Sequence, residues 1–156
     1  MWCGSPYRGH DATLLRPARA KVLQEDLLKG GPVPYSIVRA TQFMESMDAT
    51  LAMTTDGDTV RLPCTPIQPI AAAEVAAIVT EVAAGTPLNG VLNIAGPDAY
   101  PLDEIGRPTL TAEGGAGSVV TDAAAGMFAA APGDVLTAPE DARIAATHCT
   151  DWLAAR

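Results

Sequence analysis

The stretch PIQPIAAAEVAAIVTEVAAGTPLNGVLNIAG, residues 66–96, decides the fold class because it joins a helix pattern directly to a strand pattern. Glycine and proline after the first pattern predict the end of the helix. The apolar run at 89–96 then predicts a strand covered on both faces, as strands of parallel sheets are. The helix pattern is an apolar stripe at helical spacing, formed by Ala72, Val75, Ala76, Val79, Val82 and Ala83.

The alternation of helix and strand continues on both sides of this stretch. Helix and strand patterns follow one another four times, which is typical of an α/β fold. Residues 1–14 are expected to be irregular, and residues 15–156 to form one domain. The other predicted segments are helices at 15–29, 41–55, 102–110 and 150–156, strands at 33–40 and 58–63, and a loop at 114–120 that leads into another strand.

Both terminal helices carry signals for where they begin. Thr13 can cap the first helix, and Pro17 fits only within its first turn. Thr150 or Asp151 can cap the last helix, and Trp152 is interpreted as its packing anchor. Two glycines end the first helix, whose apolar face is predicted to hold Ala20, Leu23 and Leu27.

Composition limits the classes of partner. A formal net charge of −8 disfavours binding to phosphate backbones, so no nucleic-acid partner is expected. No segment approaches 18 unbroken apolar residues, and the N-terminus does not resemble a signal peptide, so no membrane partner is expected either. Aromatic residues make up only 4%, so the core must consist mostly of aliphatic side chains and modest stability is expected.

The cysteines indicate a cytoplasmic protein with reduced thiols. There are three, at positions 3, 64 and 149, and an odd, scattered set does not suggest a disulfide framework. No CxxC pattern occurs, so no zinc site is expected. His148 and Cys149 are neighbours whose side chains point apart, which favours a buried thiol beside a surface histidine over a catalytic pair.

Two further patterns are interpreted as structural. The Gly-rich run GGAGS at 114–118 precedes a predicted strand and lacks the GxGxxG spacing, so it is expected to be a connection and not a phosphate-binding loop. Met44, Met47 and Met53 are expected to fill the core, with the first two on one helix face.

Several segments in order resemble one family. ARAKVLQEDLLKGGPVPYSIVRATQF is followed by DGDTVRLP, PIQPIAAAEVAAIV, LNGVLNIAGPDAYPLDEI and a closing DWL. Together, over roughly residues 17–153, they are similar to the C-terminal half of NmrA-like, NAD(P)H-binding atypical short-chain dehydrogenases. The resemblance implies the C-terminal portion of a Rossmann-like fold, without the βα units that carry the family's Gly-rich cofactor loop.

The resemblance also implies roles for particular residues. In the family a Tyr-x-x-x-Lys pair moves a proton during hydride transfer, and the lysine holds ribose hydroxyls. Lys21 stands at the lysine position, but Pro17 stands at the tyrosine position and cannot transfer a proton. Lys21 is therefore either the remaining catalytic and cofactor-binding residue or an ordinary solvated helix lysine.

The resemblance places the nicotinamide or substrate near the residues that follow the strand at 33–40. The candidate cofactor-binding residues there are Arg39, Thr41, Gln42 and Phe43, because ligands of open α/β sheets bind beyond the carboxyl ends of the strands. The structural alternative is that Arg39 pairs with an acidic neighbour and Phe43 packs in the core. Glu74, which matches an acidic residue of the family, is interpreted mainly as favourable charge at a helix start.

The expected function is that of a truncated, NAD(P)-dependent oxidoreductase-related protein. It would act on a small carbonyl or quinone-like substrate, with a missing N-terminal half as partner, and with weak or no NAD(P)H binding on its own. The alternatives are a non-catalytic regulatory module that senses redox cofactors or binds a protein, and a fragment without function. The strand at 33–40 would lose its neighbours, so its exposed sheet edge predicts self-association or marginal stability.

Overall fold

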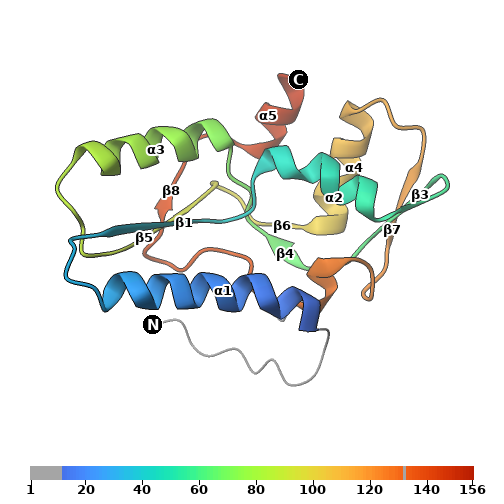
Figure 1. Cartoon of the computed structure of the whole chain (residues 1–156). Helices are drawn as coiled ribbons and strands as arrows, with labels where there is room; N and C mark the ends of the chain where they lie inside the picture. The colour runs from blue at the N-terminus through green and yellow to red at the C-terminus, as the bar shows by residue number, and fades with distance from the viewer. Residues whose placement is uncertain (1–11, 132) are drawn as a thin grey trace. The chain divides into compact units, whose positions relative to one another are not determined.

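The computed structural model describes residues 12–131 and 133–156 of the chain (Figure 1). It is a mixed α/β structure that contains parallel strands. Contacts divide the chain between Val33 and Pro34 into two units. In its described part the first unit holds one helix, and the second unit holds all the strands and the remaining helices.

The helix of the first unit, α1, spans Ala12–Lys29. It begins three residues earlier than predicted. Thr13 therefore lies inside the helix and not at its cap, and Pro17 lies beyond its first turn. The predicted apolar face is wrong as a buried face, since Ala20 is exposed and Leu23 and Leu27 are 61% and 70% exposed. The helix ends where Gly30 N–H donates to the Asp26 carbonyl at 2.9 Å, as the two glycines predicted.

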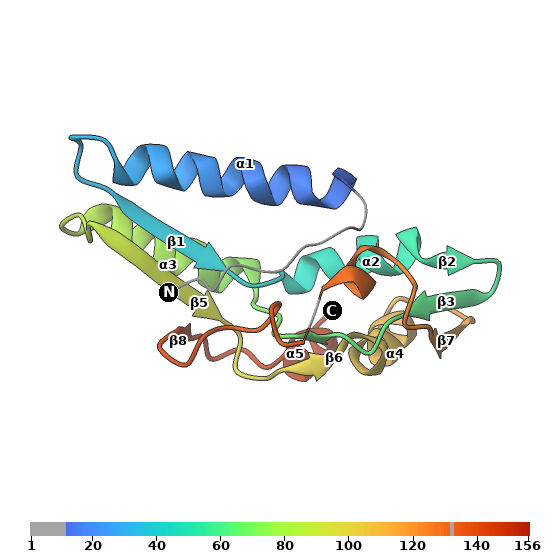
Figure 2. The same ribbon diagram turned by 90° about the horizontal axis from the view of Figure 1, so that it is seen from below.

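The second unit is organised around a parallel sheet of three strands in the order β1 (Ser36–Ala40), β5 (Gly90–Ala95) and β8 (Arg143–Ile144). In its register Ile37 pairs with Val91, and Ala95 pairs with Ile144. The strands predicted at 33–40 and 89–96 are confirmed, whereas the short strand β8 was not predicted. Figures 1 and 2 show α3 (Ala72–Ala84) running along β1 and β5.

The stripe by which α3 contacts the sheet differs from the predicted one. Ile78 is the buried residue of the helix, with Val75 and Val82 partly buried beside it, and all three pack with Ile70, Ile94 and Ala145. Ala76, Val79 and Ala83 are exposed instead. Residues 75, 78 and 82 are spaced i, i+3 and i+7, as residues on one helix face are. The helix is therefore correctly predicted, but its buried face is rotated by about one residue from the predicted stripe.

A second group of elements packs around a larger core. Its strands are β2 (Thr55–Asp56), β3 (Thr59–Leu62) and β7 (Ser118–Thr121) in one sheet, and β4 (Pro66–Ile67) and β6 (Tyr100–Pro101) in another. Its helices are α2 (Met47–Met53), α4 (Leu102–Ala112), α5 (Cys149–Ala154) and the 3-10 turns η1 (Met44–Ser46) and η2 (Met127–Ala130). The fully buried members of this core include Met44, Leu62 and Leu102. As predicted, Met44 and Met47 fill the core; Met53 is 70% exposed, which contradicts core filling there.

The helix predicted over 41–55 begins only at η1, because the preceding residues extend the sheet. Ile70 N–H donates to the Gln42 carbonyl at 2.9 Å, and Met44 N–H donates to the Ile70 carbonyl at 3.0 Å. Phe43 forms a parallel bridge with Ile70 between these two bonds. A long-range partner therefore keeps these residues extended, which a local helix pattern does not report.

The last helix begins at Cys149, after His148 in extended conformation, and no side chain caps it. The predicted caps Thr150 and Asp151 are therefore wrong, since both lie inside the helix. Trp152 is partly buried against the larger core, as its predicted anchoring role requires, and the Arg156 guanidinium lies 4.8 Å from its ring centroid. The side chain of Arg156 also pairs with Asp48 of α2, with an Nη1–Oδ1 distance of 2.8 Å.

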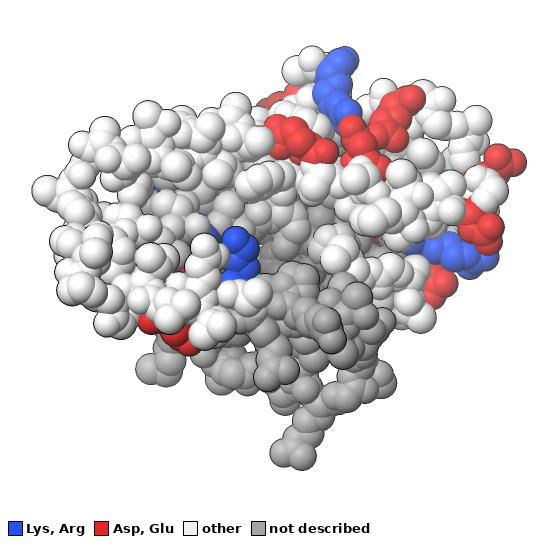
Figure 3. Space-filling model, viewed as in Figure 1, with Lys and Arg blue, Asp and Glu red and all other residues white. Residues whose placement is uncertain are grey.

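Uncharged residues form most of the face shown in Figure 3, in line with a chain of which 18% is charged. Within the described residues, no helix combines the length and the apolar character that crossing a bilayer requires.

Candidate functional site at the carboxyl edge of the parallel sheet

The carboxyl ends of the three parallel strands share one edge of the sheet, and the loops that leave them are hydrogen-bonded to one another. Past the end of β1, Thr41 N–H donates to the Ile94 carbonyl at 3.2 Å. Past the end of β8, Ala145 N–H donates to the Ala95 carbonyl at 2.8 Å. The hydrogen-bond ladder thus continues beyond the strands and fixes the position from which the polar loop residues extend.

Gln68, which follows β4, bonds the loops after β1 and β5 and the segment that precedes β8. Its Nε2 donates to the Gly96 carbonyl at 2.8 Å, and its Oε1 accepts from Ala138 N–H at 2.9 Å. Its backbone carbonyl accepts from the Thr41 hydroxyl at 2.5 Å, and its N–H donates to Gln42 Oε1 at 3.4 Å. Gln68 is part-buried, so these bonds replace water and hold the edge in one arrangement.

Gly96 allows this close approach. A Cβ atom at this position would lie 1.7 Å from the Pro69 carbonyl oxygen and 2.8 Å from its carbon. Any side chain larger than hydrogen would force the backbone after β5 away from the segment that carries Gln68.

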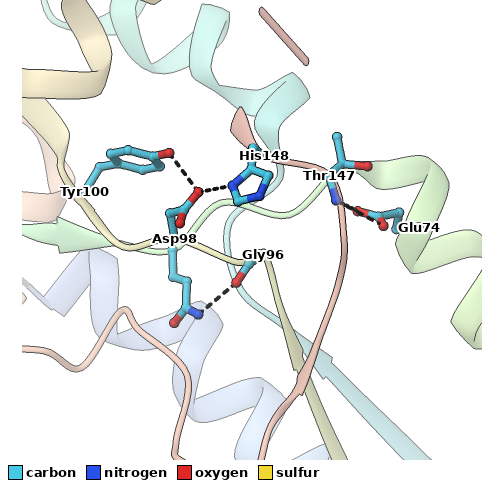
Figure 4. A network of polar contacts seen from close by, with 7 residues as sticks. Glu74, Gly96, Asp98, Tyr100, Thr147 and His148 are labelled. Atoms are coloured by element: carbon cyan, nitrogen blue, oxygen red, sulfur yellow. Dashed lines mark hydrogen bonds and ion pairs between the residues drawn. The ribbon is translucent and has the colours of Figure 1, made fainter. Parts of the chain in front are cut away.

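A second group on this edge, the Asp98 triad, consists of Asp98, Tyr100 and His148 (Figure 4). Both partners bond the same carboxylate oxygen: the Tyr100 hydroxyl donates to Asp98 Oδ2 at 3.0 Å, and His148 Nδ1 lies 2.5 Å from it. Asp98 and Tyr100 follow β5, whereas His148 follows β8 and precedes α5. The triad therefore ties the loops beyond two neighbouring parallel strands together.

The residues of the triad shift one another's pKa values. The hydrogen bond and the charge of Asp98 raise the pKa of His148 above its usual 6.5, with a smaller contribution from Asp151. The same hydrogen bond lowers the pKa of Asp98 below its usual 3.8. With half of its side chain exposed, His148 can exchange protons with a bound molecule or with solvent near neutral pH.

Tyr100 has the opposite character from an activated catalytic tyrosine. Burial, and then its bond to the Asp98 carboxylate, raise the pKa of Tyr100 to about 12. An active tyrosine needs a lowered pKa, as a neighbouring lysine would give it. Tyr100 therefore holds Asp98 and cannot replace the tyrosine missing at position 17.

The structure confirms the predicted character of the neighbouring pair His148–Cys149. Cys149 is 1% exposed, and burial raises the pKa of its thiol to about 11. The thiol is protonated and enclosed, so it is not a nucleophile. Of the other two cysteines, Cys64 is a free, exposed thiol, and Cys3 lies outside the described residues.

Two glutamates fix the start of α3 against this edge. The Glu74 carboxylate accepts from Ala146 N–H at 2.9 Å and from Thr147 N–H at 3.2 and 3.3 Å, which ties the first turn of α3 to the segment after β8 (Figure 4). Glu74 therefore makes specific hydrogen bonds in addition to supplying the predicted charge at a helix start. The Glu45 carboxylate accepts from Ala72 N–H at 3.0 and 3.1 Å, so it caps α3 from η1.

The residues predicted from the sequence fall into two places. Lys21 belongs to α1 of the first unit, where its exposed Nζ lies 3.4 Å from Gln24 Oε1. Arg39 lies within β1 opposite Asn93, and Thr41, Gln42 and Phe43 follow β1 in the second unit, as predicted.

Phe43 is 41% exposed, so it does not pack in the core. It lines a hollow of about 420 Å³ together with Val38, Ala40, Thr41, Ser46, Val75 and Val79. Thr41 and Phe43 are thus the predicted residues that meet at a concave surface.

Gln68, Asp98 and His148 were missed as site residues. A usable signal existed for Asp98, because polar residues directly after a buried strand lie at the carboxyl edge of a parallel sheet, where ligands bind. Gln68 and His148 reach the same edge through loops of irregular structure, and no periodic pattern marks them.

Comparison of the chain with protein-family models, with curated protein sequences and with solved structures found no match. The described residues include no group of three or more His, Cys, Asp or Glu side chains that could hold a metal ion. The run GGAGS leads into β7, as predicted for a connecting loop. The NmrA-like resemblance and its cofactor thus stay predictions.

Proposed function

We propose that this chain forms the substrate-side half of an NmrA-like, Rossmann-type oxidoreductase that uses NAD(P)H and reduces a small carbonyl or quinone-like substrate. The observation that carries the proposal is the parallel sheet whose three carboxyl ends meet at one polar edge, built by Gln68 and the Asp98 triad. Open α/β sheets bind their ligands beyond this edge.

The outer edge of β1 supports the proposal that this sheet is half of a larger one. Thr41 donates its N–H toward β5, and the Tyr35 carbonyl accepts from Asn89 N–H at 2.7 Å, so odd-numbered residues of this stretch bond toward β5. Because successive residues alternate, Ser36, Val38 and Ala40 direct their backbone groups to the other side. Within the second unit β1 pairs with β5 alone, which leaves that side for a further parallel strand.

The chain alone should bind NAD(P)H weakly or not at all, because the N-terminal ends of α3 and α4 are already occupied or acidic. A diphosphate binds at the free N–H groups of a helix N-terminus after a Gly-rich turn. In α3 the Glu45 carboxylate occupies the Ala72 N–H, and the first turn of α4 carries Asp103 and Glu104, which repel phosphate. The GxGxxG pattern does not occur in the 156 residues.

Proton transfer to a reduced carbonyl oxygen needs a group that gives a proton near neutral pH. Pro17 cannot supply one, and the raised pKa of Tyr100 disfavours its ionisation. His148 suits this task best among the described side chains on the edge, because Asp98 orients its ring and favours its charged form.

The test is to find the complementary half. The nucleotide sequence upstream of the codon for Met1 is read in all frames for a Gly-rich βαβ unit, and the encoded segment is co-expressed with this chain. The proposal predicts a complex that binds NADPH, with loss of binding when either part is omitted. Absence of any such unit upstream, or a complex that forms without gaining NADPH binding, contradicts it.

A non-catalytic module that binds a protein partner is the second candidate. Pro17 at the tyrosine position, and an exposed Lys21 whose Nζ lies next to Gln24 on the same helix, favour it. A pull-down with the tagged chain should then recover one specific partner whose binding is unchanged in His148→Gln. Recovery of no specific partner contradicts this candidate.

A further inference from the structure

An apolar cavity of about 270 Å³ lies in the larger core, away from the carboxyl edge. Its walls come from four segments: α2, the end of β3 with Pro63, the start of α4, and the loop around η2. Leu62 and Leu102, both 0% exposed, form its inner wall, and Met53 and Met127, 70% and 49% exposed, lie on its lining nearer the solvent. Phe128 adds an aromatic ring from η2.

The two side-chain hydroxyl groups of the lining are already bonded elsewhere. The Thr50 hydroxyl donates to the Ser46 carbonyl at 3.0 Å, and the Thr54 hydroxyl donates to the Thr50 carbonyl at 2.9 Å. No residue of the lining is charged. A molecule inside would therefore gain apolar contact and lose any hydrogen bonds it made to water, which selects against ions and strongly polar ligands.

The loop that forms one wall of the cavity is held in place by specific contacts. Gly126 has a φ of +67°, and a Cβ there would lie 2.9 Å from Thr54 Cγ2, so a glycine lets the loop lie against the end of α2. The Thr65 hydroxyl donates to the Phe128 carbonyl at 3.1 Å and anchors η2 from the other side. The wall is thus fixed, while the flexible side chains of the two methionines can adjust to an occupant.

We propose that this cavity binds a small, uncharged, apolar molecule of one or two aromatic rings. An apolar cavity of about 150 Å³ is enough to hold benzene, so the volume here accommodates a ring with substituents or a fused pair of rings. The inference rests on the lining alone and does not depend on the proposed oxidoreductase function.

The methionine methyl groups give a direct readout. The chain has five methionines, and with ¹³C-methyl labelling the signals of Met53 and Met127 report the cavity, whereas those of the buried Met44 and Met47, which do not line it, serve as internal references. Signals are assigned with Met53→Leu and Met127→Leu. Titration with toluene or 1-methylnaphthalene should shift the Met53 and Met127 signals saturably, and benzoate should not.

A matched pair of variants tests the location. Ala125 lines the cavity and Ala124 does not. Ala125→Phe should weaken toluene binding roughly tenfold or more, and Ala124→Phe should leave it unchanged. If Ala125→Phe does not melt cooperatively, Ala125→Leu takes its place, and toluene should also raise the melting temperature of the unsubstituted chain. Shifts that grow linearly on all methyl signals, or that persist in the filled variants, overturn the proposal.

Discussion

His148 Nδ1 lies 2.5 Å from Asp98 Oδ2, although the two residues are 50 positions apart in the chain. The contact joins the loop after β5 to the residue that precedes α5, and the Tyr100 hydroxyl bonds the same carboxylate oxygen. One carboxylate therefore positions an exposed imidazole and fastens the C-terminal helix to the parallel sheet.

The first prediction concerns the proton on His148. Its pKa should lie above the usual 6.5, because Asp98 stabilises the charged ring. Asp98→Asn should return the pKa toward 6.5, since the amide keeps the shape but not the charge. NMR titration of the imidazole signals measures this, with His148→Gln to distinguish the signal from that of His10. An unchanged pKa in Asp98→Asn contradicts the contact.

The same pair predicts how stability depends on pH. A raised pKa in the folded state means that the contribution of His148 is complete below about pH 6.5 and is lost as pH rises through the folded-state value. The lowered pKa of Asp98 contributes above 3.8 and is lost as pH falls through its folded-state value. Urea unfolding of the chain should show a loss of stability from pH 6 to pH 8.5 that is absent in His148→Gln.

A second prediction separates two glycines of the β5 region. Gly96→Ala should destabilise the protein by about 1–3 kcal/mol or more, because the new methyl group meets the backbone of Pro69. Gly90→Ala is the control, since its Cβ would lie 3.6 Å from the Leu88 carbonyl oxygen, an ordinary contact. Chemical denaturation compares them, and equal midpoints for the two variants would show that the loops after β5 do not approach as described.

A third prediction concerns Gln68. Gln68→Met keeps the length of the side chain but removes its bonds to Gly96 and Ala138. Two part-buried hydrogen bonds at about 0.5–1.5 kcal/mol each predict a loss of about 1–3 kcal/mol. Faster amide hydrogen exchange at Ala138 should accompany it, while exchange within α3 changes less. Unaltered protection of Ala138 would contradict the bond to Gln68.

A fourth prediction concerns the outer edge of β1. The chain should self-associate or be only marginally stable, because Ser36, Val38 and Ala40 present backbone groups on the side away from β5. Ala40→Pro removes one outward N–H, and an edge strand accepts proline there, so it should reduce self-association in gel filtration. Thr41→Pro instead removes the bond to Ile94 and should destabilise the fold without that effect.

The edge prediction has a clear contrary outcome. A sharp monomeric peak for the unsubstituted chain, together with a cooperative melt above about 60 °C, at the upper end for ordinary domains, would show that this edge is neither adhesive nor a source of weakness.

Local patterns were sufficient for the elements with a clear period. The stripe at 72–83 predicted α3, and the apolar run at 89–96 predicted β5, because both patterns depend on neighbours within a few residues. The same stripe misplaced the buried face, because apolar alanine and valine residues occur on all sides of this helix. Only packing against Ile94 shows that Ile78 faces the sheet.

The site could be predicted only in outline. The expectation that residues after β1 reach the carboxyl edge followed from α/β topology. Gln68 and Gly96 are 28 residues apart, and Asp98 and His148 are 50 apart, so their contacts depend on how the loops fold back. Strand β8 is two residues long and forms because β5 offers it an edge.

The measurement that tests the central claim most directly is a titration of the purified chain with NADPH and NADH, followed by calorimetry and by tryptophan fluorescence. The account predicts no saturable binding up to about 1 mM, because Glu45 caps the start of α3 and the first turn of α4 carries Asp103 and Glu104. Saturable binding with a dissociation constant on the order of 1 μM would contradict it.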